Sequence, residues 1–214
     1  MTKSEQAVSM LQRMIEEGRL EPGTMVSERS LMDLTNLGRT PVREAIQRLA
    51  LNRMVRIHPN KGIEVPGVSV EDQLSGLEVR RAIEVLAVTL ACERATTSQI
   101  TQIEKLAVDL KKEFDLERYT ETVRQTHDLI IEAAHNPYLE ALMTPLQALS
   151  RRFWIMHIRD ETDIHVGQRL HRELLIAISK RNIEAASAAS MALNDYLVQF
   201  SLSVLTVRAA KLVR

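Results

Sequence analysis

Apolar residues recur with a helical period in the first fifty positions of the chain, and this pattern predicts three helices. The first helix is expected over residues 4–17, with Gly18 placed to end it. The second is expected over residues 28–35, because Ser27 in front of it is a favourable N-cap. The buried side of this second helix is predicted to consist of Leu31 and Leu34.

A third helix is expected after the break at residues 36–38, with Thr40 as its N-cap. Pro41 suits the first helical position, where no backbone N–H is needed, and Arg39 then stands just before the helix. The apolar stripe comprises Val42, Ala45, Ile46 and Leu49. The outward face comprises Thr40, Arg43, Glu44, Gln47 and Arg48. Two short helices joined by a tight turn, the second with a polar, arginine-bearing face, are typical of a helix-turn-helix.

The next segment changes to a strand-like alternation of apolar and polar residues. Residues 55–58 alternate, residues 59–62 read as a turn, and residues 63–65 alternate back, which predicts a β-hairpin with Lys61 and Gly62 at its tip. A glycine at the tip allows the backbone to approach a phosphate or the minor groove closely. Three helices and a hairpin together predict a winged helix.

Beyond residue 66 no strand alternation of any length remains, and helical stripes dominate. They predict helices over residues 70–95, 98–116, 119–134, 138–157, 163–180 and 182–205. We therefore expect a mainly α fold, an N-terminal winged helix-turn-helix (three helices plus β-hairpin) followed by an all-α antiparallel helical bundle. The expected boundaries are 1–66 for the first domain, 67–75 for a hinge and 76–214 for the second domain.

The charge of the chain is distributed unevenly. The formal net charge is zero, yet residues 29–61 carry seven Lys or Arg against two acidic residues, as expected of a small nucleic-acid-binding module. The first residues lack the apolar core of a secretory signal, and no run reaches the ~18 apolar residues that a membrane span needs. A single cysteine, Cys92, allows no internal disulfide. We expect a cytoplasmic protein with no membrane partner.

Three polar residues of the second domain, Arg80, His127 and His171, fall on stripes that are otherwise apolar. A buried arginine must be paired or face a wet cavity, and its planar guanidinium suits a carboxylate. Imidazoles can donate hydrogen bonds to an anion, above all when they are protonated near pH 6. The three residues predict a polar pocket for a small carboxylate, and the alternative is that each histidine is an ordinary core residue.

The segment from Gly18 to Val65, with "RTPVREAI" followed by a "KG" wing, resembles the DNA-binding domain of the GntR family of bacterial transcription regulators. The DNA-contacting residues that the resemblance implies are Arg29, Arg39, Thr40, Arg43, Lys61 and Gly62. Gln47, on the outward face of the third helix, is added to this set. Gly38 departs from the family, which usually carries serine there, so a phosphate contact or a firm helix start is expected to be lost.

The segments "LEVRRAIEVLAVTLACERAT", "THDLIIEAAHNPYLEAL" and "HRELLIAISKRNIEAA" resemble the ligand-sensing FCD domain of the FadR subfamily. Many such domains hold a divalent metal through one aspartate and three histidines, beneath a cavity for a small organic acid. By this resemblance His127 and His171 occupy two of the histidine positions. Val123 stands where the aspartate is expected, and the last histidine position falls near Leu193 or Asn194.

Half of the implied metal ligands are thus missing, and two imidazoles make a poor closed site. We expect no tightly bound cofactor, and the alternative is a divalent metal such as zinc or nickel at His127 and His171. The predicted effector-binding residues are Arg80, His127, His171 and Asn194.

The sequence therefore predicts a homodimeric, DNA-binding transcription regulator, a repressor, whose affinity for a double-stranded operator is controlled by a small carboxylate effector. The alternative is a DNA-binding protein without an effector, in which the bundle serves dimerisation only. We do not expect an enzyme, because the chain shows no nucleophile motif, no phosphate loop and no complete metal ligand set.

Overall fold

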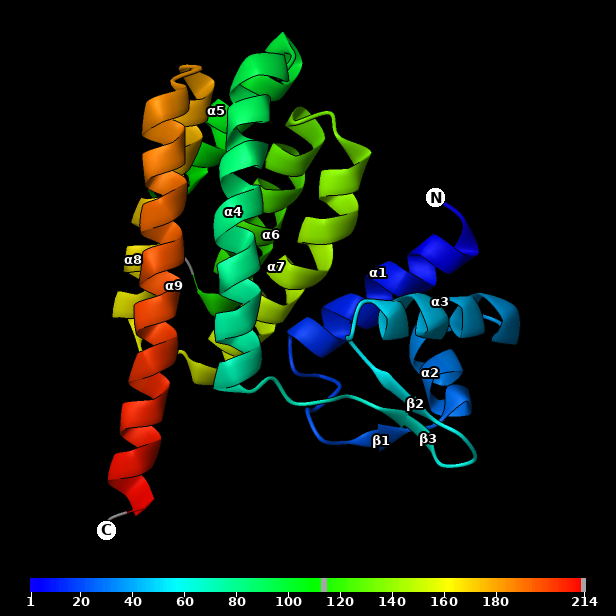
Figure 1. The fold of residues 1–214 in the computed structure, drawn as a ribbon. Coiled ribbons are helices and arrows are strands. Elements are labelled where there is room, and N and C mark those ends of the chain that lie inside the picture. Colours follow the sequence, from blue (N-terminus) through cyan, green and yellow to red (C-terminus); the bar gives the residue numbers. More distant parts are fainter. Residues whose placement is uncertain (113–114, 213–214) are drawn as a thin grey trace. The chain divides into compact units, whose positions relative to one another are not determined.

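The computed structural model describes residues 1–112 and 115–212 and confirms the mainly helical fold (Figure 1). Contacts divide the chain into two units. The first comprises Met1–Ser69 and Ala148–Met156, and the second comprises Val70–Gln147 and His157–Arg214. Each unit has a hydrophobic core of its own.

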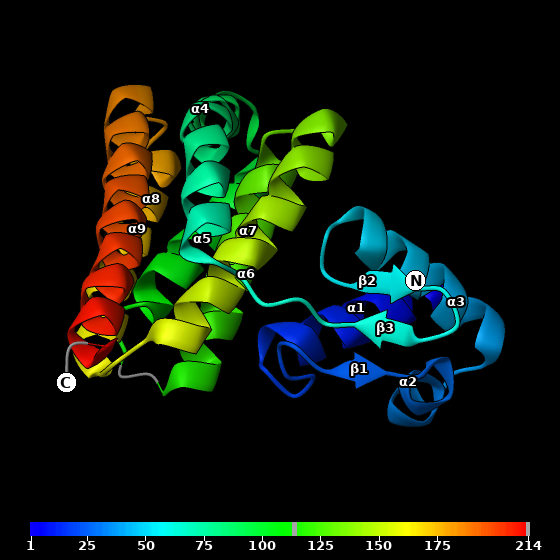
Figure 2. The same ribbon diagram turned by 60° about the horizontal axis from the view of Figure 1, so that its bottom comes forward.

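The first unit is a winged helix-turn-helix. Its helices are α1 (Lys3–Glu16), α2 (Glu28–Thr35) and α3 (Arg39–Leu51), and its strands are β1 (Met25–Val26), β2 (Arg56–His58) and β3 (Gly62–Glu64). The strands form one antiparallel sheet in the order β1-β3-β2 (Figure 2). Its core is aliphatic and includes Ala7, Leu11, Leu31, Val42, Leu49 and Ile63. Arg151 forms a buried ion pair with Glu16 inside this unit, at 3.0 Å.

The predicted hairpin is present as β2 and β3, and the structure adds a third strand to it. This strand, β1, pairs with β3 through Met25 and Val26 and is too short to show any alternation in sequence. One local prediction for this unit was wrong. Leu34 was expected in the core and is 48% exposed. Helix α2 faces the core through Leu31 and Thr35, which lie four positions apart, so that Leu34 is rotated to the surface.

The second unit is an all-α bundle. Its helices are α4 (Val70–Arg94), α5 (Thr97–Asp109), α6 (Leu116–Ala133), α8 (Glu161–Ser179) and α9 (Ile183–Leu212). Helix α7 (Pro137–His157) belongs to this unit except for Ala148–Met156, which is part of the first unit. Helices α4 and α9 run side by side, and α9 also packs on α8 (Figures 1 and 2). Buried aliphatic side chains fill the interior, among them Val88, Ile103, Ile130, Leu175 and Ile178. No helix in the described part of the chain is long and apolar enough to cross a membrane.

Some helix ends in the second unit differ from the sequence prediction. Helix α5 starts after Thr96, which forms a capping box with Gln99, rather than at Ser98. It ends at Asp109, well before the predicted residue 116, and positions 113 and 114 of that prediction lie outside the described residues. The same holds for positions 213 and 214 of the predicted second domain. Helix α4 begins at Val70, so the second part of the expected hinge is helical.

Candidate DNA-binding surface and effector pocket

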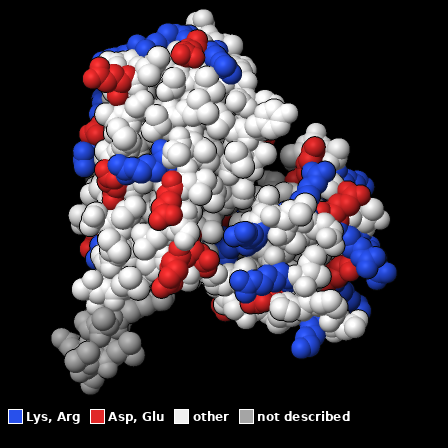
Figure 3. Space-filling model, viewed as in Figure 1, with Lys and Arg blue, Asp and Glu red and all other residues white. Residues whose placement is uncertain are grey.

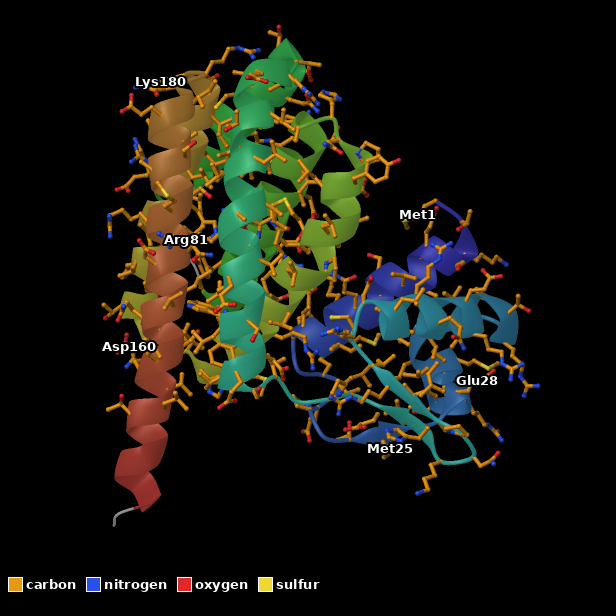
Figure 4. All side chains as sticks on the ribbon, viewed as in Figure 1. Met1, Met25, Glu28, Arg81, Asp160 and Lys180 are labelled. Atoms are coloured by element: carbon orange, nitrogen blue, oxygen red, sulfur yellow. The ribbon has the colours of Figure 1, made fainter. Side chains whose placement is uncertain are left out.

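The start of α3 presents two exposed arginines that share one carboxylate. The Arg43 Nε lies 3.0 Å and the Arg39 Nε 3.6 Å from Oε1 of Glu28, the first residue of α2 (labelled in Figure 4). The arginine side chains are 75% and 66% exposed for Arg39 and Arg43. Glu28 orients the two guanidinium groups. Because ion pairs this exposed contribute little free energy, an anionic partner can still compete for both arginines.

The other predicted DNA-contacting side chains are also at the surface. Arg29, Thr40, Gln47 and Lys61 are exposed. Gln47 lies one helical turn after Arg43 and so extends the same face of α3. Figure 3 shows Lys and Arg spread over the visible face of the first unit. This surface combines an exposed helix face with exposed Lys and Arg side chains, the two features expected of a DNA-binding surface.

Helix α3 begins two residues earlier than the sequence predicted. Its N-cap is Gly38, and Arg39 is the first helical residue, so Thr40 is not the cap and Pro41 is the third residue. Proline is compatible with this position because the first N–H groups of a helix have no intrahelical partner. Because Gly38 has no side chain, the first backbone N–H groups of α3 receive no hydrogen bond from an N-cap side chain.

Gly62 has a structural reason within the wing. Its φ is +118°, and a Cβ at this position would lie 2.9 Å from the Val26 carbonyl oxygen of β1. The glycine thus allows β1 to pair with β3, a requirement that the sequence did not reveal. Two residues further along β3, Glu64 accepts a 2.6 Å hydrogen bond from the His58 ring, and its carboxylate lies 3.7 Å from the Arg56 guanidinium.

In the second unit, Arg80 of α4, His127 of α6 and His171 of α8 are all buried and lie close together. The two imidazole ring centroids are 5.3 Å apart. The positive charge of Arg80 is near enough to help lower the pKa of His171. The predicted cluster of one arginine and two histidines from three helices is therefore present in the fold.

Sequence reasoning missed the partner of Arg80. The guanidinium donates two hydrogen bonds to Glu84 on the same helix, from Nε at 3.0 Å and from Nη2 at 2.6 Å, and both go to Oε1. The side chains are 1% and 8% exposed. The signal was present in the sequence as an arginine and a glutamate four positions apart, the spacing that brings side chains together on a helix.

The His171 ring is not the hydrogen-bond donor to an anionic ligand that the sequence suggested, because its N–H is engaged by the backbone. Burial, above all, lowers its pKa to about 4, so the ring is neutral at pH 6 and above. Its Nδ1 donates to the Gly167 carbonyl oxygen at 2.8 Å, which makes Nε2 the acceptor of the neutral ring. Nε2 has no hydrogen-bond partner among the described residues. A ligand group that reaches it must donate a hydrogen bond.

A small cavity of about 10 Å³ lies between Glu84 and His127. Its apolar walls include Val88, Ile130, Leu174 and Leu193. Gln147 and Ser190 add polar groups. This volume holds roughly one water molecule, so an organic acid enters only when side chains move. Asn194 serves a structural contact, since its Nδ2 donates to the Leu77 carbonyl oxygen of α4 at 3.1 Å.

Comparison with known proteins identifies both units. Residues 3–65 match the family model described as bacterial regulatory proteins, gntR family, and residues 76–195 match the FCD domain, which is more than half of the chain. The chain belongs to the GntR family and carries an FCD domain. The resemblance found in the sequence is thereby confirmed, and this GntR-family chain is a transcriptional regulator with a DNA-binding domain.

Its relatives are regulators of similar length. The HTH-type transcriptional repressor RspR of Escherichia coli is 28% identical over 96% of this chain and 90% of its own. The galactonate operon transcriptional repressor of Escherichia coli is 24% identical over 89% and 93%. Among solved structures, Escherichia coli McbR/YncC superposes with a TM-score of 0.80 at 19% identity, covering 96% of this chain and 99% of that one. A putative GntR regulator from Rhodococcus gives 0.72 at 20%, covering 94% and 98%.

The pocket of this FCD domain does not fit a metal ion. Among the described residues, no group of three or more His, Cys, Asp or Glu side chains is arranged to hold one. Val123 is buried on α6 and offers no donor atom. Two other potential ligands in this unit are engaged elsewhere. His165 contacts Gln168, and Asp195 pairs with Arg81, which Figure 4 labels. Two imidazoles alone fall short of the three or four protein ligands that zinc takes.

Proposed function

We propose that this GntR-family regulator is a cytoplasmic, sequence-specific repressor controlled by a small organic acid. In this proposal residues 1–66 bind a double-stranded operator, residues 67–75 form the hinge, and residues 76–214 bind the effector and dimerise. The observation that carries the DNA part is the exposed Arg39–Arg43 pair at the N-terminus of the second helix of a helix-turn-helix.

The docking follows from where the cations lie. The N-terminal turn of α3 enters the major groove, where Arg43 reads a base edge or a phosphate and Gln47 extends the contact along the groove. Arg29 and Arg39 contact the backbone, and the wing reaches a neighbouring phosphate through Lys61. Glu28 presets the direction of the arginines before DNA arrives.

The DNA contacts can be tested with a sequence selected from a random double-stranded library by the wild-type protein. Arg43→Ala should lower affinity for the selected site by about 1–3 kcal/mol and lower affinity for unrelated DNA less. Arg169→Ala, an exposed arginine on α8 of the second unit, is the control for loss of one positive charge. Equal affinities for wild type and Arg43→Ala at physiological salt would contradict this docking.

A homodimer gives the regulator two winged helices for two half-sites. The proposal is supported by exposed apolar side chains on the two neighbouring helices α4 and α9, among them Val79, Leu86, Met191 and Leu202. Figure 3 shows a broad part of the visible surface of the second unit without charged residues. Sedimentation should give a dimer at micromolar concentration, and Leu86→Glu should shift it toward monomer. A monomeric wild type with and without DNA would refute this part.

The effector proposal rests on Arg80, a buried cation whose partner Glu84 lines the cavity together with His127. The ring of His127 lies 5.3 Å from that of His171. A carboxylate satisfies Arg80, and a hydroxyl or amine on the same ligand satisfies the acceptor Nε2 of His171. Asn194 is left with its structural contact.

The effector part is tested by adding hydroxy acids to the protein bound to its selected site. We expect at least one to release the protein from DNA and to raise its melting temperature, since binding to the folded state stabilises it. If no acid has either effect, the alternative of a bundle that only dimerises is favoured. We assign no catalytic role, because the relatives named above are described as transcriptional repressors.

A further inference from the structure

The Arg80–Glu84 pair is an unusual way to satisfy a buried arginine, because it connects no two parts of the fold. Both residues belong to α4, four positions apart, so their pairing does not hold one helix against another. Buried ion pairs contribute little net stability, since desolvation of both charges offsets their attraction. A purely structural role therefore explains the pair poorly.

The geometry of the pair is also incomplete as a carboxylate site. Both hydrogen bonds from Arg80, through Nε and Nη2, end on the same oxygen of Glu84, Oε1. A free carboxylate can instead place one oxygen on each of two N–H groups, and such bidentate pairs are the stronger and more directional ones. An external carboxylate thus has a better fit to the guanidinium than the internal one.

Glu84 stands at the point where an entering ligand would arrive. It lines the small cavity together with His127, and that cavity has room for about one water molecule. Rotation of the Glu84 side chain would both widen the cavity and leave two donors of Arg80 without their acceptor. Opening the space and exposing the cation are therefore one movement of one side chain.

We propose that Glu84 is a built-in occupant of the effector site, which holds Arg80 in the ligand-free protein and is exchanged for the carboxylate of the effector. This inference rests on the effector function proposed above and adds how the site is regulated. The exchange lowers the apparent affinity for every carboxylate, because a ligand binds only the fraction of molecules in which Glu84 has left Arg80. Weak carboxylates of general metabolism are thereby excluded, while a ligand with further contacts is accepted.

Acetate is a suitable probe, because the part of Glu84 beyond its Cβ has the size and charge of acetate. Glu84→Ala leaves Arg80 buried beside a vacated space, and its melting temperature should fall below that of the wild type. Acetate at tens of millimolar should raise the melting temperature of this variant by about 3 °C or more. The wild type should not respond, and neutral acetamide should not replace acetate.

Glu78→Ala, an exposed glutamate on the same helix, is the matched control and should behave as wild type toward acetate. If Glu84→Ala does not fold, Glu84→Gln keeps the side-chain volume and removes the internal anion. Its affinity for acetate, measured by calorimetry, should exceed that of the wild type by about tenfold or more, because no internal carboxylate then occupies Arg80. The wild type responding to acetate as strongly as the variants, or neither variant responding, would overturn the exchange.

These measurements use no DNA, so they fail separately from the function on which they rest. If a hydroxy acid releases the wild-type protein from its operator while Glu84→Gln binds that acid no more tightly, the exchange is overturned and the regulator function stands. Tighter binding of that acid by Glu84→Gln than by Glu78→Gln supports the exchange directly.

Discussion

Replacing His171 should change how the stability of the protein depends on pH. In the folded protein burial lowers the pKa of this histidine to about 4, against 6.5 for an unperturbed imidazole. Above pH 6.5 the ring is neutral in both the folded and the unfolded chain. Between pH 6.5 and 4 the unfolded chain binds a proton that the folded chain does not, so stability falls as the pH falls. Below pH 4 this loss is complete.

The size of the effect follows from the difference between the two pKa values. A difference of about 2.5 pKa units corresponds to about 3 kcal/mol of unfolding free energy, of which about 2 kcal/mol is already lost at pH 5. His171→Asn removes the titrating group, and its amide can still donate to the Gly167 carbonyl oxygen. The variant is expected to be less stable at pH 7 and to lose less stability on acidification.

Urea unfolding at pH 7, 6 and 5, followed by the helical circular dichroism signal, measures this difference. The quantity to compare is the change in unfolding free energy from pH 7 to 5, which should be about 2 kcal/mol larger for wild type than for His171→Asn. His165→Asn, at an exposed position on the same helix, should follow the wild type. Parallel curves for wild type and His171→Asn would show that His171 is not held neutral by burial.

Three further predictions concern particular backbone and side-chain positions. Gly38 is the extended N-cap of α3, and a Cβ added to it would meet no other atom, so a serine side chain there should cap the helix. The unfolding free energy of Gly38→Ser should exceed that of Gly38→Ala by about 1 kcal/mol, and equal values would show that a side-chain cap contributes nothing here. Gly167→Ala should destabilise by about 1–3 kcal/mol, although alanine favours helices, because its Cβ would clash with the hydroxyl of the buried Tyr119. Tyr119→Phe should recover part of this loss in the double variant. Glu28→Gln should raise the affinity for unrelated DNA and reduce the preference for the selected site by about 1 kcal/mol, as measured by titration with each DNA. An unchanged ratio of the two affinities would argue against a role of Glu28 in orienting Arg39 and Arg43.

The winged helix could be predicted from sequence because its signals are local. Periodicity located the helices, turn residues separated them, and the cations on the outward face of α3 are exposed as expected. What failed depends on contacts between distant residues. β1 exists because β3 passes beside it, and Leu34 is exposed because the core is reached by Leu31 and Thr35. Neither outcome has a signature within its own segment.

The effector pocket shows a different limit. Helical stripes placed Arg80, His127 and His171 on buried faces, and those faces do meet in the bundle. The protonation and tautomer of His171, however, depend on a carbonyl one turn earlier and on how completely the ring is buried. A sequence shows which residue types share a face but not which atoms remain open to a ligand.

The same limit explains why the charge of the pocket was misjudged. From sequence, Arg80 is interpreted as a permanent positive charge available to an anionic ligand. Val123 stands where a metal site would need the negative charge of an aspartate. In the fold Glu84 neutralises Arg80, so the buried pair carries no net charge and attracts an organic acid only weakly from a distance. Selectivity in such a pocket must come from contacts made after entry, at the guanidinium and at the acceptor Nε2 of His171. A carboxylate without a hydrogen-bond donor gains only the first of these, and for that reason simple acids are expected to bind poorly where hydroxy acids bind well.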